Sequence, residues 1–192
     1  MMTKYVIKSA TDVIHEANLD LDEDSMALLA PKQSPLEFLH ALINAGIYYD
    51  AVTYLVCMLP MRKALWWGYQ CAREQLQYDP TDQQKRTLET VMSWFGQSNE
   101  TNRRRVGDWA DACNNETPAG FIATAVFFSE GSVADEDSPP AYPLPYAYAH
   151  ATSDAVVSSA HLAESDAEEL QRRFQRFLHL GEQLLDQQIE VM

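Results

Sequence analysis

Apolar residues recur along this chain at the three- and four-residue spacing of amphipathic helices, and short polar breaks separate the runs. The clearest run begins with the SPLE sequence at residues 34–37, which combines a serine cap, a proline in the first turn and a glutamate that can reach back to the cap. Leu39 and Ile43 continue its apolar face, and Gly46 supplies a stop signal. The pattern predicts a helix that ends at this glycine.

Further helices are predicted by the same signals, and the connections between them are only a few residues long. Short connections favour antiparallel neighbours. We therefore predict an all-α protein, a single domain over residues 1–192 built from stacked antiparallel helical hairpins. The expected helices cover residues 47–59, 61–78, 81–95, 101–113, 121–128 and 146–163, followed by a long C-terminal helix that opens with the SDAE sequence at residues 165–168.

Around these helices, the chain divides by composition. An acidic N-terminal segment covers residues 1–33, helical hairpins cover 34–130, a loop covers 131–145, and C-terminal helices cover 146–192. Prolines at positions 139, 140, 143 and 145 remove backbone donors, which predicts a proline-rich loop rather than a helix. Its PPAY sequence at residues 139–142 matches a short pattern that WW domains bind, so partner docking is an alternative to simple loop stiffening.

The C-terminal helix carries an apolar stripe with a glycine, Gly181, in its middle. A glycine at that position permits the close approach of another helix. The stripe can pack either on its own domain or on a second copy, which leaves a homodimer through the C-terminal helix open. Its residues are Leu170, Phe174, Phe177, Leu178, Leu184 and Leu185.

Charge is distributed unevenly along the 192 residues, whose formal net charge is -14. Residues 1–60 carry 3 basic and 8 acidic side chains, residues 61–115 carry 8 and 7, and residues 116–192 carry 3 and 13. Such an acidic surface repels nucleic-acid phosphate, so we expect no nucleic-acid partner. No run approaches the roughly 20 apolar residues of a membrane span, and no secretory leader is evident, so we expect a cytoplasmic protein without a membrane partner.

Residue types that carry chemistry do not occur at the spacing their chemistry needs. The five histidines form no pair three or four residues apart, and the three cysteines are an odd, widely spaced set, which argues against a metal site or a disulfide framework. No glycine-rich phosphate loop or nucleophile elbow is present. We therefore expect no catalytic residue, metal or cofactor. The arginine triplet at 103–105 is expected to form an exposed face paired with Glu100, Asp108 and Asp111.

The predicted helix at residues 61–78 has two tryptophans in unusual places. At about 100° per residue, its apolar face contains Ala72 and Leu76, and Arg73 belongs to the opposite, polar face. Trp66 then falls within the polar face and Trp67 at its edge. Either the proline-rich loop covers Trp66, which is the simpler interpretation, or Trp66 is exposed for a partner, because tryptophan and arginine dominate interface hot spots. The candidate partner-binding residues are Trp66, Trp67, Arg73, Tyr142 and Tyr146.

A series of short sequences between about residues 35 and 162 resembles an uncharacterised bacterial family associated with type VI secretion gene clusters. The resemblance implies a helical adaptor or chaperone that acts in the cytoplasm on secretion components or cargo. It supplies no catalytic residues. The sequences that carry it are LPMRKALWW at 59–67, CAR at 71–73, Trp94, Arg103-Arg104, Pro118-Ala119, and FFSEGS at 127–132 before the prolines.

Three functions follow as hypotheses. The first is a non-enzymatic interaction protein, an adaptor or chaperone of a bacterial secretion system, with its protein partner bound near the tryptophans and the proline-rich loop. The second is an acidic blocker, such as an immunity protein or nucleic-acid mimic that covers a basic active site, suggested by the charge of residues 116–192. The third is a helical enzyme, which would require a convergent polar pocket in the structure.

Overall fold

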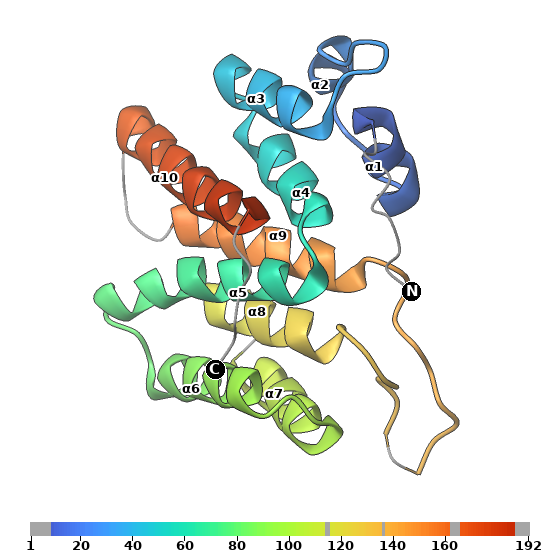
Figure 1. The fold of residues 1–192 in the computed structure, drawn as a ribbon. Coiled ribbons are helices and arrows are strands. Elements are labelled where there is room, and N and C mark those ends of the chain that lie inside the picture. The colour runs from blue at the N-terminus through green and yellow to red at the C-terminus, as the bar shows by residue number, and fades with distance from the viewer. Residues whose placement is uncertain (1–8, 114–115, 136, 162–165, 187–192) are drawn as a thin grey trace.

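The computed structural model describes residues 9–113, 116–135, 137–161 and 166–186 (Figure 1). Over these residues the chain is all-α, as predicted, with no β-strand, and no helix there is long and apolar enough to cross a membrane. The elements are α1 (Ala10–Ala17), α2 (Glu23–Ala27), α3 (Pro35–Ala45), α4 (Tyr48–Met58), α5 (Met61–Ala72), the 3-10 helix η1 (Arg73–Gln77), α6 (Asp82–Gly96), α7 (Glu100–Ala112), α8 (Pro118–Phe127), α9 (Ala147–Ala160) and α10 (Ala167–Asp186).

Several helices begin at side-chain caps, among them the cap predicted at Ser34. Ser34 accepts a hydrogen bond from the backbone N–H of Glu37, and the Glu37 side chain reaches back to the backbone of Ser34. Thr81 and Gln84 form the same reciprocal pair at the start of α6, and Thr117 caps α8. These contacts satisfy backbone donors that the first helical turn leaves unpaired, so each cap fixes where its helix starts.

The acidic N-terminal segment contains two helices that we did not predict. Ser9 and Asp12 form a capping box at the start of α1. The backbone N–H of Asp22 and the hydroxyl of Ser25 both donate to the carboxylate of Asp50 on α4, which holds α2 against the domain. At the other end of the chain, Ser165 of the predicted cap lies outside the described residues, and Asp166 accepts the N–H of residue 169 at 2.8 Å.

The predicted helix over residues 61–78 is interrupted, because α5 ends at Ala72 and continues as the 3-10 helix η1. A 3-10 helix has three residues per turn rather than 3.6, so side chains after Arg73 leave the faces that an α-helix would give them. Gln75 is consequently buried and its side-chain oxygen accepts the backbone N–H of Ala119 at 3.1 Å. Leu76, which we placed on the apolar face, is 42% exposed.

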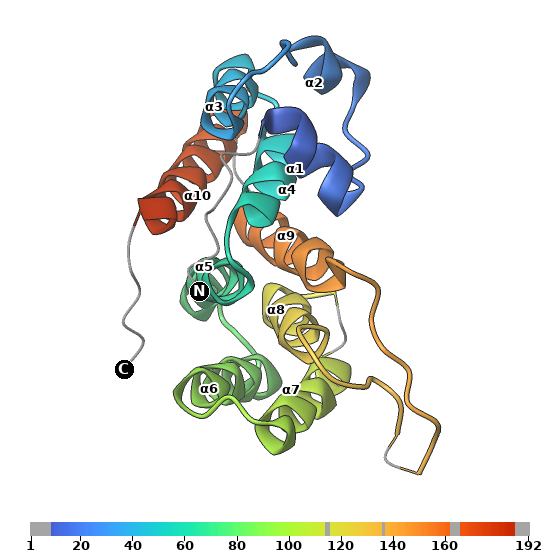
Figure 2. The same cartoon turned by 45° about the vertical axis from the view of Figure 1, so that its right-hand side comes forward.

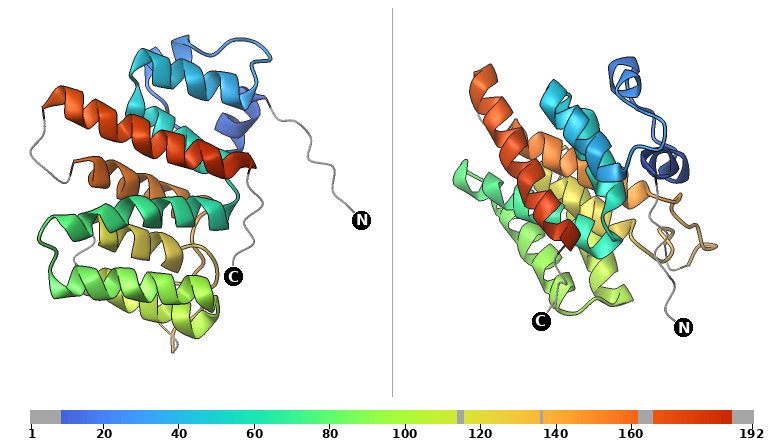
Figure 3. Two further views of the ribbon diagram at one scale, coloured as in Figure 1. Left: turned by 60° about the vertical axis from the view of Figure 1, so that its left-hand side comes forward. Right: turned by 45° about the horizontal axis from the view of Figure 1, so that its top comes forward.

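Three helices, α5, α8 and α9, form the middle of the molecule (Figure 2). The α3, α4 and α10 helices lie on one side of them, and α6 and α7 lie on the other, as two further views show (Figure 3). Each side has its own cluster of buried apolar residues, and both clusters draw on α5 and α9. Trp66 and Tyr148 pack against both clusters, so the helices form one domain.

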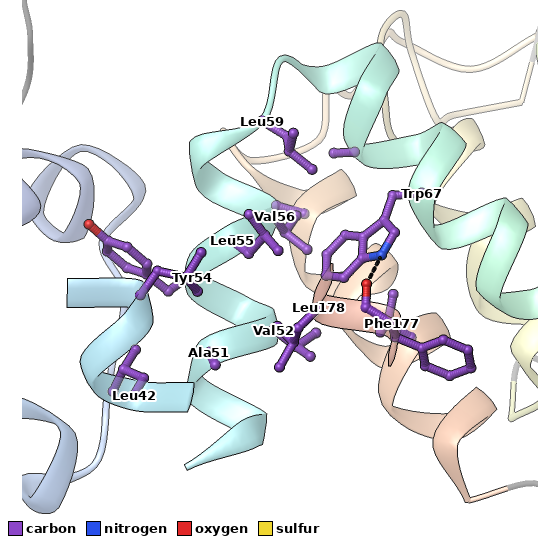
Figure 4. Packing of buried hydrophobic residues seen from close by; sticks show 14 of the residues in the cluster. Leu42, Ala51, Val52, Tyr54, Leu55, Val56, Leu59, Trp67, Phe177 and Leu178 are labelled. Carbon is purple, nitrogen blue, oxygen red and sulfur yellow. Dashed lines mark hydrogen bonds between the residues drawn. The ribbon is translucent and has the colours of Figure 1, made fainter. Parts of the chain in front are cut away.

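The cluster on the side of α3, α4 and α10 has Trp67 at its centre, and the side chain of this residue is fully buried (Figure 4). Its indole N–H donates to the backbone carbonyl of Phe177 on α10 at 2.8 Å. Gly181 follows one helical turn later, and a Cβ atom there would lie 2.8 Å from both Leu55 Cδ2 and Trp67 Cε2. The glycine therefore permits the expected close approach of α10. The apolar stripe of α10 packs on its own chain, the first of the two packings considered from the sequence.

The predicted exposed arginine face on α7 is wrong for Arg103, because this side chain is completely buried. Its guanidinium group makes two hydrogen bonds of 2.7 Å to the Glu100 carboxylate. It also donates to the backbone carbonyls of Phe127 and Ser132, and lies 4.9 Å from the centroid of the Phe127 ring. A guanidinium group has five N–H donors in a fixed planar arrangement, so one buried arginine can bond several acceptors at once.

Arg103 and its neighbour Arg104 thereby hold the first part of the proline-rich loop against α7. Arg104 donates to the backbone carbonyl of Ala134 at 3.0 Å and to the Glu100 carboxylate at 2.8 Å. Within the loop, the N–H of Val133 donates to the carbonyl of Ala141 at 2.7 Å, which closes its base. The loop therefore leaves the domain from a fixed position.

Replacing Gly181 with alanine should lower the free energy of unfolding by about 2 kcal/mol, because the added methyl group overpacks the contact with Trp67. Gly96 is a matched control, since a Cβ atom there meets nothing within 4 Å. Gly96→Ala should stay within about 1 kcal/mol of the wild type or be slightly more stable. Urea denaturation followed by circular dichroism measures both values, and equal effects of the two substitutions would contradict the proposed packing constraint.

Arg103→Lys should lower the free energy of unfolding by about 2 kcal/mol, because lysine cannot satisfy the separate acceptors that the guanidinium group bonds. The amides of Val133 and Ala141 should exchange hydrogen faster, since the loop loses its attachment to α7. The exposed Arg105 provides the control, and Arg105→Lys should change neither quantity. Unchanged amide exchange in Arg103→Lys would show that the loop is held by other contacts.

The hydrogen bond from Arg103 lowers the pKa of Glu100 below its ordinary value of 4.5. A folded-state pKa below the unfolded value adds stability that is complete above the unfolded pKa and is lost as the pH falls through the folded pKa. Because half of the Glu100 side chain is exposed to solvent, we expect Glu100→Gln to cost only about 1 kcal/mol near pH 7. This difference should shrink toward pH 3 in urea denaturation, and a pH-independent difference would exclude the charge as its cause.

Candidate functional site

Solvent-exposed apolar side chains gather beside the end of α5, in a groove between η1 and α6. The groove has a volume of about 590 Å³, which is within the range of ligand-binding sites. Leu76 of η1 is 42% exposed and Met92 of α6 is 47% exposed, although both are large apolar residues. We call this feature the η1–α6 groove. It is lined by the apolar residues Tyr69, Leu76, Leu88 and Met92 and by the polar residues Lys85, Glu89 and Ser93.

A packed aromatic cluster supports one end of the groove. The ring of Trp66 stacks on that of Tyr69 with centroids 5.4 Å apart, and it meets Phe95 of α6 edge to face at 5.2 Å. Tyr69 and Phe95 are 5.9 Å apart. Burial raises the pKa of the Tyr69 hydroxyl, and the positive charge of Arg73 opposes that shift. Packing with the other two rings fixes the ring of Tyr69, the member of the three that lines the groove.

Positive charge borders the apolar lining. The guanidinium group of Arg73 lies 5.8 Å from the centroid of the Tyr69 ring, and the side chain is exposed. Lys85 lies 3.7 Å from a carboxylate oxygen of Asp82, but both side chains are largely exposed. Such a pair is worth little and leaves the lysine free to contact a ligand. The lining also contains one carboxylate, that of Glu89, one helical turn after Lys85 on α6.

Two of the predicted partner-binding residues contact a lining residue of this groove, and a third is buried elsewhere. Trp66 and Arg73 both contact Tyr69 in the groove wall. Trp67 is fully buried against α10, so its prediction as a surface residue is wrong. The expected cover of Trp66 by the proline-rich loop is also wrong, because α6 supplies that cover through Phe95 and the loop is bonded to α7 instead.

The other two predicted residues lie apart from the groove. Tyr142 is in the proline-rich loop and is 72% exposed. Tyr146 precedes α9 in a left-handed backbone conformation, with φ of 63°, and its ring stacks on Tyr148 at 6.2 Å. Neither residue lines the η1–α6 groove. The structure therefore separates the five candidates into a pair beside the groove, a pair at the loop and a buried tryptophan.

Leu76 and Met92 are exposed lining residues of the groove that the sequence analysis did not single out. Leu76 has the periodicity of a core residue in a continuous α-helix, and only the change to a 3-10 helix turns it outward. Met92 follows the buried Val91 and has the same spacing from Leu88 that core residues have. No local signal distinguishes it, because its exposure depends on which helices cover α6.

The side chains that often perform chemistry are either buried or scattered. Burial raises the pKa of the Cys57 thiol to about 12 and that of the Cys71 thiol well above its usual range, so neither forms a thiolate near neutral pH. No three metal-ligating side chains lie together in the part of the chain that the structure covers. The lining of the η1–α6 groove suits the binding of an apolar group.

Comparison with known proteins identifies one family. A family of unknown function, DUF6931, matches residues 38–185, from α3 to the last turn of α10. The match includes both helices that form the groove and excludes α1 and α2. No curated protein and no solved structure matches the chain.

The dye anilinonaphthalene sulfonate, an apolar anion, should bind the native protein through the η1–α6 groove. Leu76→Glu and Met92→Glu should each weaken its binding by about fivefold, because each removes apolar contact area and adds a repelling charge. Leu36 is a matched control, being 44% exposed on α3, and Leu36→Glu should leave binding unchanged. Fluorescence titration under native conditions measures the affinities. Equal weakening by all three substitutions would place the dye elsewhere.

Proposed function

This chain belongs to the protein family DUF6931, whose function is unknown, and we propose that it is a non-enzymatic interaction protein that binds a helix of a protein partner in the η1–α6 groove. The observation that supports this proposal is the exposure of Leu76 of η1 and Met92 of α6 in a groove whose lining is mainly apolar. Exposed apolar residues that gather in a groove mark interaction sites, whereas isolated ones need no explanation.

The chemistry of the groove suggests which kind of helix it accepts. An amphipathic helix binds such a groove with apolar side chains three or four residues apart. Leu76, Leu88 and Met92 supply the apolar contact for these anchors. Arg73 and Lys85 favour carboxylates on the flank of the partner helix. Elsewhere the acidic surface repels such a helix, so charge restricts it to this site and sets its orientation.

The resemblance to a family associated with type VI secretion gene clusters suggests the setting. We propose that the partner is a secretion component or a cargo protein, and that the chain acts as an adaptor or chaperone in the cytoplasm. A chaperone that covers an apolar helix before assembly requires an open apolar groove of this kind. The proposed partner segment is therefore one that becomes buried when secretion components assemble.

The acidic-blocker hypothesis receives less support from the contacts of α10. Glu168 and Glu169 pair with Arg172 and Arg173 on the same helix. Glu182 lies 2.7 Å from the imidazole of His40. Carboxylates that are already paired within the chain contribute less to the attraction of a basic partner.

Affinity capture from the source bacterium, at low and high salt, tests the proposal with four forms of the protein. The wild type and the Leu36→Glu control should retain the same partner, and Leu76→Glu and Met92→Glu should lose it. Cross-linking should then join residue 76 or 92 to a partner segment with apolar residues at helical spacing and flanking carboxylates. A partner that all four forms retain, or a cross-linked segment without that pattern, would overturn the assignment of the groove.

A further inference from the structure

A second groove lies where α8, α9, the end of α1 and the proline-rich loop meet. Its volume is about 500 Å³, a size typical of small-molecule sites. The phenyl ring of Phe121 comes from α8 and that of Phe128 from the residue that caps its end, and Leu144 belongs to the loop. Leu144 is 80% exposed, so the loop offers this side chain to the groove rather than to the core. We call this feature the α8–α9 groove.

The polar side chains of the α8–α9 groove have an unbalanced charge. Asp154 and His150 lie one helical turn apart on α9, and Asn18 at the end of α1 completes this side. No lysine or arginine occurs among the lining residues that the structure places. The Asp154 carboxylate is accessible to solvent and is not paired with any cationic side chain of the described chain. The groove thus presents one carboxylate between apolar walls.

The Asp154 carboxylate is exposed at the groove, beside apolar lining residues. The surrounding protein raises the pKa of Asp154, and the nearby His150 opposes the rise. A cation that reaches this exposed carboxylate gains a charge-assisted hydrogen bond, because no cationic side chain of the described residues is paired with it. A fully hydrated metal ion gains nothing from the phenyl and leucine side chains beside it. A cation carried on an apolar group uses both parts of the groove.

We propose that the α8–α9 groove binds a small organic amine, with its ammonium group against the Asp154 carboxylate and its apolar body between Phe121 and Leu144. Asn18 also lines the groove, and its side-chain amide oxygen is a hydrogen-bond acceptor that suits an ammonium group. Phenyl rings also attract ammonium groups through their faces, which favours an amine over a neutral analogue of the same shape. The carbonyl of Leu144 accepts the backbone N–H of Ala147 at 3.0 Å, which holds this end of the loop against the start of α9.

Phenethylammonium is a suitable probe, because it carries a primary amine on a phenyl ring. Its binding should shift the backbone amide resonances of Ala147 and Ala151, two lining residues, in a saturable nuclear magnetic resonance titration. Phenethyl alcohol, which has the same body without the charge, should bind about tenfold more weakly. Asp154→Asn should weaken phenethylammonium binding by about tenfold or more, and should abolish the difference between the two probes.

Two further variants separate this site from a general charge effect. Asp108 is an exposed carboxylate on α7, and Asp108→Asn should leave the affinity for phenethylammonium unchanged. Leu144→Ala should weaken binding about threefold without lowering the melting temperature, because the side chain is exposed in the free protein. Equal affinity for the amine and the alcohol, or unchanged amine binding in Asp154→Asn, would overturn the proposal. Tighter binding of Nα-acetyl-lysine amide, whose side chain keeps its ammonium group, would also overturn it, because that result would assign the groove to a lysine of a protein partner.

Discussion

The contact of α10 with α5 at Trp67 and Gly181 is the constraint on which the rest of the structure depends. The indole N–H of Trp67 donates to the carbonyl of Phe177 at 2.8 Å, and the missing side chain of Gly181 leaves room for the ring. This contact commits one face of α5 to α10. Because residues in an α-helix follow one another at about 100°, the next face, which carries Trp66, turns toward α6. Of the two adjacent tryptophans, Trp67 therefore packs against α10 and Trp66 contacts α6.

The η1–α6 groove follows from the way α5 ends. A continued α-helix would keep Leu76 in line with the buried residues of α5, but the 3-10 turn after Ala72 buries Gln75 and exposes Leu76. Gln75 then bonds the first turn of α8, so the change of helix type has a packing reason as well as a functional consequence. The same 3-10 turn therefore exposes the apolar surface that we propose as a partner site and buries the polar side chain of Gln75.

The two grooves differ in charge because different parts of the chain build them. Residues 61–115, which carry nearly balanced charge, supply the η1–α6 groove with Arg73 and Lys85 beside it. The strongly acidic remainder of the chain supplies Asp154 to the α8–α9 groove. The buried Arg103 fixes the start of the proline-rich loop, and the far end of the same loop supplies Leu144 and Pro145 to the second groove. The η1–α6 groove therefore has cationic side chains beside its apolar lining, whereas the α8–α9 groove has a carboxylate.

The sequence by itself determined the helical class, the caps at Ser34, Thr81 and Thr117 and the proline-rich break, because capping and hydrophobic periodicity act within about four residues. A similar capping box at Ser9 marked α1, although we did not use it. Only the tertiary structure decided that Trp67 and Arg103 are buried and that Leu76 and Met92 are exposed. Burial of a side chain depends on which distant helix covers it. Residues about 110 positions apart, such as Trp67 and Phe177, meet through contacts that no local pattern encodes.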